Sequence, residues 1–399
     1  METIRKIYRI GNGPSSSHTM APRRAAWMFK EKNPQATVYR VTLYGSLAAT
    51  GKGHLTDKAI EESMNPHKVM IVWKPEVFLP FHNNAMLFEA MDTHNNVTDS
   101  WTIYSVGGGK LANENTVLKE EKIYEHTNTT DILNYIEEKG LTYWEYLNRY
   151  ESSDIWDFLN EVWKVMQAAI ERGVQTDGVI PGGLYLRRKA ASYYVKASSY
   201  KPSLQGRCLV IAYALATAEE NASGGEIVTA PTCGSSGVLP AVLYHLKTNH
   251  RFTDKQILKA LASAALFGNV VKANASISGA EVGCQGEIGT ACAMAAVAAN
   301  QLFGGSPQQI EYAAEMALEH HLGLTCDPIC GLVQIPCIER TAFAALRALD
   351  ANLYAMMSDG KHIVSFDKVV KTMNLTGNDL PSLYKETAMG GLALLNKKQ

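Results

Sequence analysis

Hydrophobic and polar positions change their period along this chain of 399 residues. Positions 39 to 43 alternate between apolar and polar side chains, a period of two that is typical of a half-buried strand. Compact β-branched and aromatic runs at 68–73 and 101–106 predict two more strands. Helices are expected between them at about 22–32 and 57–64. The first part of the chain therefore predicts a small α/β or α+β unit.

The second part of the chain follows a helical period. Trp156, Leu159, Trp163, Met166 and Ile170 recur every three to four residues, behind acidic residues that suit a helix N-terminus. More helices are expected at 205–222, 254–272, 286–303, 307–322 and 338–357.

A polar and acidic stretch at about 128–153 predicts a linker between the first, mixed part of the chain and the second, helical part. We therefore expect the fold class α+β, with a small N-terminal α/β domain at 1–145. A larger, all-α helical domain is expected at 155–399.

Composition narrows the classes of function. The chain carries 38 Lys and Arg against 39 Asp and Glu, a formal net charge of -1, with no long run of either sign. Nucleic acid and anionic membrane surfaces are therefore not expected as partners. The start of the chain lacks the apolar core of a signal peptide, and we expect a cytoplasmic protein. An odd count of seven cysteines argues against a disulfide framework.

Three of these cysteines stand in Gly- or Pro-bearing segments beside polar residues. They are Cys284, Cys326 and Cys337, and their setting favours three ligands for one metal centre. Three thiolates on an iron–sulfur cluster leave one iron without a protein ligand, and such an iron can act as a Lewis acid. Two alternatives stay open: free cysteines are often small core residues, and Cys326 with Cys330 is a CxxxC pair that suits half of a zinc site.

Several loops offer donors for a substrate anion. The segment 11–19 concentrates hydroxyls and an imidazole just before an expected helix, and 51–57 is a second glycine-bearing loop with a histidine. The segment 229–237 precedes an apolar helix start and forms an anion cradle. The segment 272–281 adds an ammonium, an amide and hydroxyls close to Cys284. Each is a weak signal alone.

Taken together, these segments resemble the bacterial iron–sulfur L-serine dehydratases over nearly the whole chain. The matching motifs are GPSSSHT at 13–19, YGSLAATGKGH at 44–54, SVGGG at 105–109, PGGL at 181–184, TAPTCGSSG at 229–237, GAEVGCQGEIG at 279–289 and CGLVQIPCIER at 330–340. The resemblance implies a [4Fe-4S] cluster on Cys284, Cys326 and Cys337. It also implies His54 as the catalytic base and His18 as the other active-site histidine.

The same resemblance implies that L-serine is converted to pyruvate and ammonia in a site between the two domains. The residues expected to bind the substrate are Ser15, Ser16, Ser17, Thr19, Ser235, Ser236, Lys272 and Asn274. A homodimer is expected by family analogy. Some relatives end in a cysteine that caps the open iron, but this chain has none after Cys337, so water or a small anion is expected there.

Three rival functions stay open on sequence alone. A pyridoxal-phosphate enzyme would use Lys272 as its Schiff-base lysine, but would leave the three cysteines unexplained. A cysteine desulfidase would use the same cluster to expel sulfide. A non-enzymatic iron–sulfur sensor or electron carrier would use Cys330 as a fourth ligand.

Overall fold

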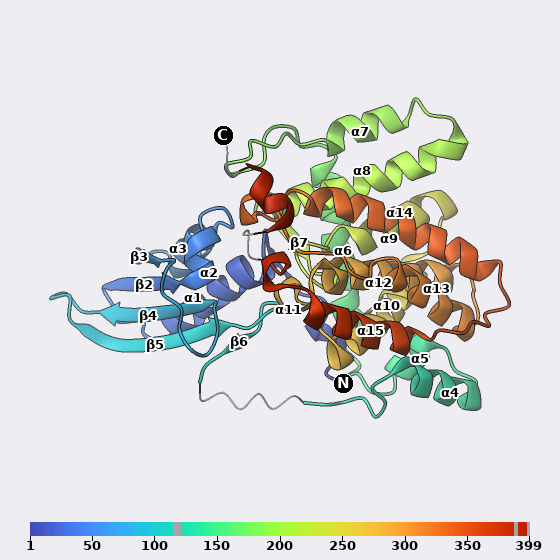
Figure 1. Cartoon of the computed structure of the whole chain (residues 1–399), viewed down its shortest axis with the longest axis horizontal. Helices are drawn as coiled ribbons and strands as arrows, with labels where there is room; N and C mark the ends of the chain where they lie inside the picture. The colour runs from blue at the N-terminus through green and yellow to red at the C-terminus, as the bar shows by residue number, and fades with distance from the viewer. Residues whose placement is uncertain (115–120, 387–389, 397–399) are drawn as a thin grey trace.

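The chain folds into a sheet domain and a larger helical domain that lie side by side in a computed structural model (Figure 1). The structure describes residues 1–114, 121–386 and 390–396. Within these residues, the main sheet has five strands in the order β3-β2-β4-β5-β6. Strands β2 and β3 pair in parallel, and the other neighbours are antiparallel. The strands are β2 (Val38–Tyr44), β3 (Lys68–Lys74), β4 (Ala85–Met91), β5 (Val97–Ser105) and β6 (Leu111–Ala112).

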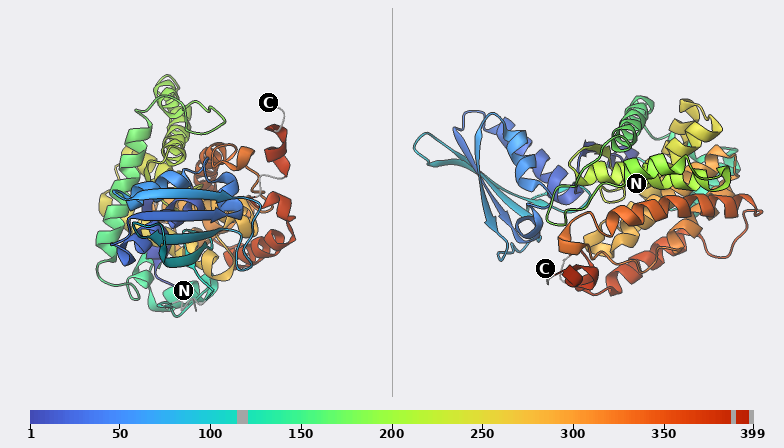
Figure 2. Two further views of the ribbon diagram at one scale, coloured as in Figure 1. Left: turned by 90° about the vertical axis from the view of Figure 1, so that its left-hand side faces the viewer. Right: turned by 90° about the horizontal axis from the view of Figure 1, so that it is seen from above.

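One side of this sheet is covered by helices. They are α1 (Ala21–Lys32), α2 (Gly45–Thr50) and α3 (Thr56–Met64). Ala25, Ala26 and Phe29 of α1 are fully buried against sheet residues such as Tyr39 and Val41. The small alanines let the helix backbone approach the sheet closely. In Figure 2 the blue helices lie on the side of the sheet that faces the helical domain, so the loops that join them to the strands point toward that domain.

The helical domain is built around α12 (Thr290–Leu302), which is buried along almost its whole length. Its alanine-rich surface lets four helices pack closely around it, namely α9, α10, α13 and α14. The other helices after residue 150 are α6 (Ile155–Gly173), α7 (Ala190–Ala197), α8 (Pro202–Ala222), α9 (Val238–His250), α10 (Asp254–Asn274), α11 (Gly279–Val282), α13 (Pro307–Glu319), α14 (Cys337–Met356) and α15 (Phe366–Asp379). The shorter helical turns are η1 (Ile4–Lys6), η2 (Ser16–Met20), η3 (Gln285–Gly289), η4 (Ile329–Gly331), η5 (Ser382–Tyr384) and η6 (Gly391–Asn396).

The stretch predicted as a linker contains two helices instead. They are α4 (Thr129–Lys139) and α5 (Tyr143–Leu147). Ile132 and Ile136 of α4 and Tyr143 of α5 are fully buried in the core of the helical domain. The linker prediction is wrong at this stretch, because a few well-spaced apolar residues dock two otherwise polar helices. The predicted domain bounds stay a prediction.

The first residues of the chain also belong to the helical core. Ile4 and Ile7 are fully buried there, and the Tyr8 hydroxyl donates to the carbonyl of Leu261 at 2.8 Å. Strand β1 (Ile10–Asn12) then pairs antiparallel with β7 (Glu226–Val228). The chain therefore starts in the helical domain, crosses to form the sheet domain, and returns.

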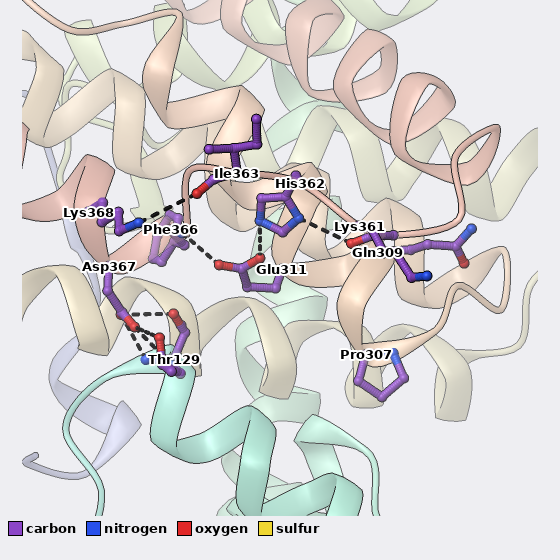
Figure 3. Close-up of polar contacts among 12 residues, drawn as sticks. Thr129, Pro307, Gln309, Glu311, Lys361, His362, Ile363, Phe366, Asp367 and Lys368 are labelled. Carbon is purple, nitrogen blue, oxygen red and sulfur yellow. Dashed lines mark hydrogen bonds and ion pairs between the residues drawn. The ribbon is translucent and has the colours of Figure 1, made fainter.

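Polar contacts tie three helices of this domain together (Figure 3). The Asp367 carboxylate of α15 accepts hydrogen bonds from the backbone N–H groups and hydroxyls of Thr129 and Thr130, at 2.6 to 2.8 Å. Glu311 of α13 accepts from the Phe366 N–H at 2.6 Å and lies 2.6 Å from His362 Nε2. These two carboxylates fix the starts of α4 and α15.

None of the described helices combines the length and apolar character that a bilayer crossing requires.

Candidate active site

The three cysteines predicted as metal ligands lie far apart in the sequence and line one buried pocket together with Cys233. It is called here the thiol pocket. Cys284 follows α11, Cys326 precedes η4, and Cys337 begins α14. Their exposed fractions are 2%, 3% and 7%. The sulfur atoms of Cys284 and Cys326 and a carboxylate oxygen of Glu287 all lie within 4.8 Å of one another. The structure therefore brings the predicted cysteine triad together.

The thiol pocket concentrates groups that become negative when ionised. The hydrogen bond with Cys284, and then burial, raise the pKa of the Cys326 thiol well above its usual range. Burial and the neighbouring Cys284 do the same to the pKa of Cys337. Burial also raises the pKa of Glu287 to about 6 and, together with the Glu287 charge, that of Glu386 to about 8.

Such a donor set is stabilised by a cationic centre, because thiolates packed together repel one another until a metal ion compensates their charge. Gly279 leaves the space that this requires: a Cβ atom added there would lie 3.0 Å from Cys326 Sγ and 2.5 Å from a Glu287 oxygen. The three cysteines thus form a candidate metal site. Their number and burial fit an iron–sulfur group with one iron left to the substrate.

The C-terminal segment is fastened to this site through Cys326. The Cys326 N–H donates to the carbonyl of Tyr384, and the Glu386 N–H donates to the carbonyl of Cys326, both at 2.7 Å. Glu386 has a left-handed backbone with φ of 60° and lines the thiol pocket. The tail therefore brings a carboxylate to the cysteines, while residues 397–399, on which the prediction about the missing terminal cysteine also rests, lie outside the described residues.

Cys330, the alternative fourth ligand, stands differently from the triad. Its side chain is exposed and its backbone is left-handed, with φ of 55°. Its neighbours Pro328 and Gly331 line the thiol pocket, and Cys330 does not. Cys292 in α12, which is buried away from the pocket, donates its S–H to the carbonyl of Ala344 at 3.2 Å.

The sheet domain forms the opposite wall of the pocket. Ser15, Ser16 and Ser17, around the start of η2, line it together with Gly107 and Gly108. Ser15 Oγ caps this turn by accepting the His18 N–H at 3.1 Å. The Ser16 hydroxyl accepts the Cys233 N–H at 3.1 Å, which ties the turn to the helical domain. The pocket therefore lies between the two domains, as ligand pockets often do.

The rings of His18 and His54 contact each other in a tilted arrangement, with centroids 4.7 Å apart, and neither residue lines the thiol pocket. Both are buried, at 1% and 2% exposed. The two loops that carry them are bonded to each other, since the Thr19 hydroxyl donates to the carbonyl of His54 and the Thr56 hydroxyl to that of His18. The structure therefore holds the two histidines as one unit.

Hydrogen bonding distinguishes the two imidazoles. His18 uses both ring nitrogens, Nδ1 with Ser17 Oγ at 2.8 Å and Nε2 with Ser46 Oγ at 3.0 Å. His54 Nδ1 lies 3.1 Å from Thr50 Oγ1, and His54 Nε2 is buried without a hydrogen-bond partner among the described residues.

The Thr50 bond fixes the tautomer of His54. The Thr50 hydroxyl already donates its proton to the carbonyl of Ser46, so it can only accept from His54 Nδ1–H. Nε2 then carries a free lone pair. Burial lowers the pKa of His54 to about 4 and that of His18 well below its usual value, so both rings are neutral at pH 7. This is the state that a general base needs.

The structure places the other predicted substrate residues outside the pocket lining. Thr19 supports the His54 loop, as described above. Ser235 bonds Thr232 and the carbonyl of Ala230, while Thr232, Cys233 and Gly234 line the pocket in place of Ser235 and Ser236. The hydroxyl of Ser236 is buried and has no partner in the described part of the chain.

Lys272 and Asn274 point elsewhere. Lys272 Nζ bonds the Glu2 carboxylate at 2.7 Å, and Asn274 donates to the carbonyls of Thr127 and Val270. They lie beside Met1 and Glu2 in a separate pocket. Closeness to Cys284 in sequence misleads here, because the chain turns sharply after α10.

Sequence reasoning missed Glu287, Glu386, Thr232 and Ser46. A lone carboxylate or hydroxyl gives no signal by itself. Glu287 lies three residues after Cys284, on the turn η3, and its place between a cysteine ligand and an expected helix was the available hint.

Fold and site together define a two-part protein with a buried thiol pocket facing a pair of neutral histidines. The comparisons with known proteins agree. The sequence model described as "Serine dehydratase beta chain" matches residues 3–68, and that described as "Serine dehydratase alpha chain" matches residues 81–393.

Curated relatives match the chain over nearly its full length. An L-serine dehydratase of Streptomyces coelicolor is 41% identical, with 97% of each chain covered. One of Haemophilus influenzae is 39% identical, with 99% of each covered. L-serine dehydratase 2 of Escherichia coli is 38% identical, again with 99% of each covered. The chain belongs to the L-serine dehydratase family, and the predicted α+β order of domain types is confirmed.

Proposed function

We propose that this protein is an L-serine ammonia-lyase that converts L-serine to pyruvate and ammonia. The observation that carries the proposal is the buried, unpartnered Nε2 of His54, whose ring contacts His18 behind the pocket residue Ser17. The same pocket is lined by the three predicted cysteine ligands. Family membership supports the same substrate, since the curated relatives are named L-serine dehydratase. The enzyme is therefore a lyase.

We propose that Cys284, Cys326 and Cys337 hold a [4Fe-4S] cluster. When bound, the cluster supplies a Lewis-acidic iron that weakens the C–O bond of the serine hydroxyl. The carboxylate groups of Glu287 and Glu386 and the hydroxyls of the sheet-domain wall surround the remaining space.

The chain's own residues orient the substrate by charge and hydrogen bonding. No lysine or arginine lies among the described lining residues of the thiol pocket, so the serine carboxylate is held by the hydroxyls of Ser15, Ser16 and Ser17. Burial and the charge of Glu287 raise the pKa of Glu386 to about 8, and a substrate ammonium beside it favours its ionised form, which accepts hydrogen bonds from that ammonium. These contacts direct the Cα–H bond toward the histidine pair.

His54 removes the Cα proton on Nε2, and the resulting positive charge is shared with Thr50 through Nδ1–H. Loss of the β-hydroxyl then gives aminoacrylate, which tautomerises and hydrolyses to pyruvate and ammonia. His18 keeps the base in place, because its ring packs against that of His54 and both of its nitrogens are bound to serines. A positioned base of this kind contributes about 10²–10⁴-fold in rate.

The rival functions have less support. Lys272 pairs with Glu2 away from the thiol pocket, which leaves a pyridoxal-phosphate Schiff base without a lysine at the site. A desulfidase shares the cysteines but not the family name of the relatives. A cluster with Cys330 as its fourth thiolate has less support, because Cys330 is exposed and does not line the pocket.

One anaerobic experiment tests the proposal. Iron and sulfide are measured in protein purified without air, and pyruvate is then followed with L-serine, L-cysteine and L-threonine. We expect iron and sulfide in equal amounts, near four of each per chain, and pyruvate from L-serine. Sulfide release from L-cysteine at a higher kcat/KM than turnover of L-serine would favour the desulfidase instead.

Homodimeric assembly and a cytoplasmic location are further proposals. The helix α14 carries exposed apolar side chains, with Phe343 at 74%, Leu353 at 60% and Met357 at 82% exposed. A stripe of this kind on one helix suits an isologous interface with a second copy. The mass of the particle in solution, measured by light scattering, tests the dimer.

A further inference from the structure

A second pocket, called here the basic pocket, lies between β1 and α1. Its volume is about 440 Å³, within the range typical of small-molecule sites. Its lining includes Arg9, Asn12, Met20, Arg23, Arg24 and Trp27. Nothing in the proposed reaction uses this pocket.

The basic pocket carries an excess of positive charge, which Glu62 and Glu2 offset only in part. Three arginines line it, and no acid stands among its described lining residues. In the described part of the chain, neither Arg9 nor Arg24 has a hydrogen bond or ion pair from its guanidinium group. Arg23 pairs with Glu62 through Nη2, but its Nε is buried without a partner among the described residues. Burial, and then the charge of Arg24, lower the pKa of Arg9.

The arginine side chains determine which kind of ligand the basic pocket can bind. Two unpaired forks bind the oxygens of phosphate or carboxylate groups bidentately. Trp27, which is 54% exposed, and Met20 provide apolar surface for the carbon body of such a ligand. The chemistry therefore fits a small organic dianion better than a monovalent inorganic ion.

The basic pocket shares its walls with the thiol pocket. Gly109 lines the first and Gly107 and Gly108 line the second. A Cβ atom added at Gly109 would lie 2.6 Å from Arg9 Nη1 and 3.5 Å from the carbonyl oxygen of Ser16. Met20, the last residue of η2, contributes to the basic pocket, while Ser16 and Ser17 at the start of the same turn face the cysteines. A ligand on Arg9 therefore touches the elements that hold the active-site serines.

We propose that the basic pocket binds a small dianion, a phosphate monoester or a dicarboxylate, and that binding changes turnover through η2 and the glycine turn at 107–109. A ligand that draws Arg9 and Arg24 together alters the packing against Gly109 and Met20. Its difference in affinity for two arrangements of that turn sets how far it shifts the equilibrium between them.

The test uses anaerobically purified holoenzyme at constant ionic strength, set with chloride. Binding of inorganic phosphate and of malonate is measured by titration calorimetry, and kcat and KM for L-serine are measured with and without each anion. Arg24→Gln removes the exposed fork with little risk to folding, and Arg9→Gln removes the partly buried one. Arg251→Gln is the matched control, since it removes an exposed arginine outside the pocket.

Saturable binding of phosphate or malonate is expected for the wild-type protein and for Arg251→Gln. Arg24→Gln and Arg9→Gln are each expected to weaken it about tenfold or more. The preferred anion identifies the ligand class. Equal affinity in all four proteins, or no saturable binding, would overturn the site. Binding that leaves both kcat and KM unchanged would overturn the coupling to turnover. The calorimetric result does not depend on the proposed reaction, so the two hypotheses fail separately.

Discussion

At the scale of single residues, the cysteines of this chain differ in their surroundings, and only some of them line the thiol pocket. Cys284, Cys326 and Cys337 converge on one pocket, whereas Cys292 is bonded to a backbone carbonyl inside the helical core. We expect Cys326→Ser to lose most of its iron, because a serine oxygen is a poor substitute for a thiolate ligand. Iron and sulfide are measured per chain after anaerobic purification.

The matched control is Cys292→Ser, which changes the same atom in a buried cysteine away from the pocket. It should keep its iron. Cys330→Ser tests the exposed cysteine in the same way. Full iron retention in Cys326→Ser would show that the triad is not the ligand set.

The histidine pair gives a second prediction at this scale. His54→Gln should retain its iron, because His54 lies in the sheet domain and contacts no cysteine, but kcat should fall by about 10²–10⁴-fold. The measurement pairs iron content with kcat for L-serine. If kcat stayed within a few-fold of wild type, the base would have to be another group, with His18 the next to test.

Single residues also show where sequence reasoning succeeds and stops. The cysteines could be grouped because each stood in an unusual local context, and all three line the same pocket in the structure. Lys272 is also polar and close to Cys284 in the sequence, yet its ammonium pairs with Glu2 in a separate pocket. Glu386 reaches the pocket from about 100 residues beyond Cys284, a convergence that no local pattern contains.

At the scale of elements, the strength of the periodic signal decided which were found. The apolar residues from Trp156 to Ile170 mark a helix that the structure extends over Ile155–Gly173. The strand β4 (Ala85–Met91) was missed because alanine, methionine, leucine and glutamate favour helices. Pairing with β2 and β5 on both sides overrides that preference.

A buried ion pair between elements gives the third prediction. His362 Nε2 lies 2.6 Å from Glu311, and its ring stacks on Tyr312 of α13 at 4.3 Å (Figure 3). The hydrogen bond to Glu311 raises the pKa of His362. The folded protein therefore binds this proton more tightly than the unfolded chain does. The stabilisation is complete below about pH 6.5, the unfolded value, and is lost as pH rises through the raised folded value.

We expect the free energy of unfolding of the wild-type protein to fall relative to that of His362→Gln as pH rises from 6 to 9. The difference should be about 0.5–1 kcal/mol, after allowance for solvent near this partly exposed ring. Urea unfolding at both pH values measures it. The charge of His362 also acts on Glu315, whose pKa burial raises to about 7, so this second pairing contributes to the same difference. A difference that grew with pH would contradict the assigned pair.

At the scale of the whole molecule, the two domains are interleaved along the chain. The first eight residues supply Ile4, Ile7 and Tyr8 to the helical core, and the sheet domain is inserted between them and α4. The boundary between the matched family segments, between 68 and 81, therefore does not coincide with the boundary of a hydrophobic core. Sequence periodicity could not reveal that the first residues belong to the helical core, because a few apolar residues are too short a stretch to show a helical or strand period.

This interleaving predicts that the helical domain cannot stand alone. A fragment of residues 121–399 lacks Ile4, Ile7 and Tyr8, and each fully buried side chain of this kind contributes about 1.5–3 kcal/mol. It also leaves β7 without its partner β1 and the Leu261 carbonyl without the Tyr8 hydroxyl. Since a domain is stable by only about 5–15 kcal/mol, we expect the fragment to unfold at a much lower temperature than the full chain.

Residues 1–14 joined to the fragment by a flexible linker should recover much of the lost stability. Ile4→Asp with Ile7→Asp in that joined segment should abolish the recovery. Thermal unfolding followed by circular dichroism measures all four proteins, and equal midpoints for the fragment and the full chain would show that the first residues are not part of the helical core.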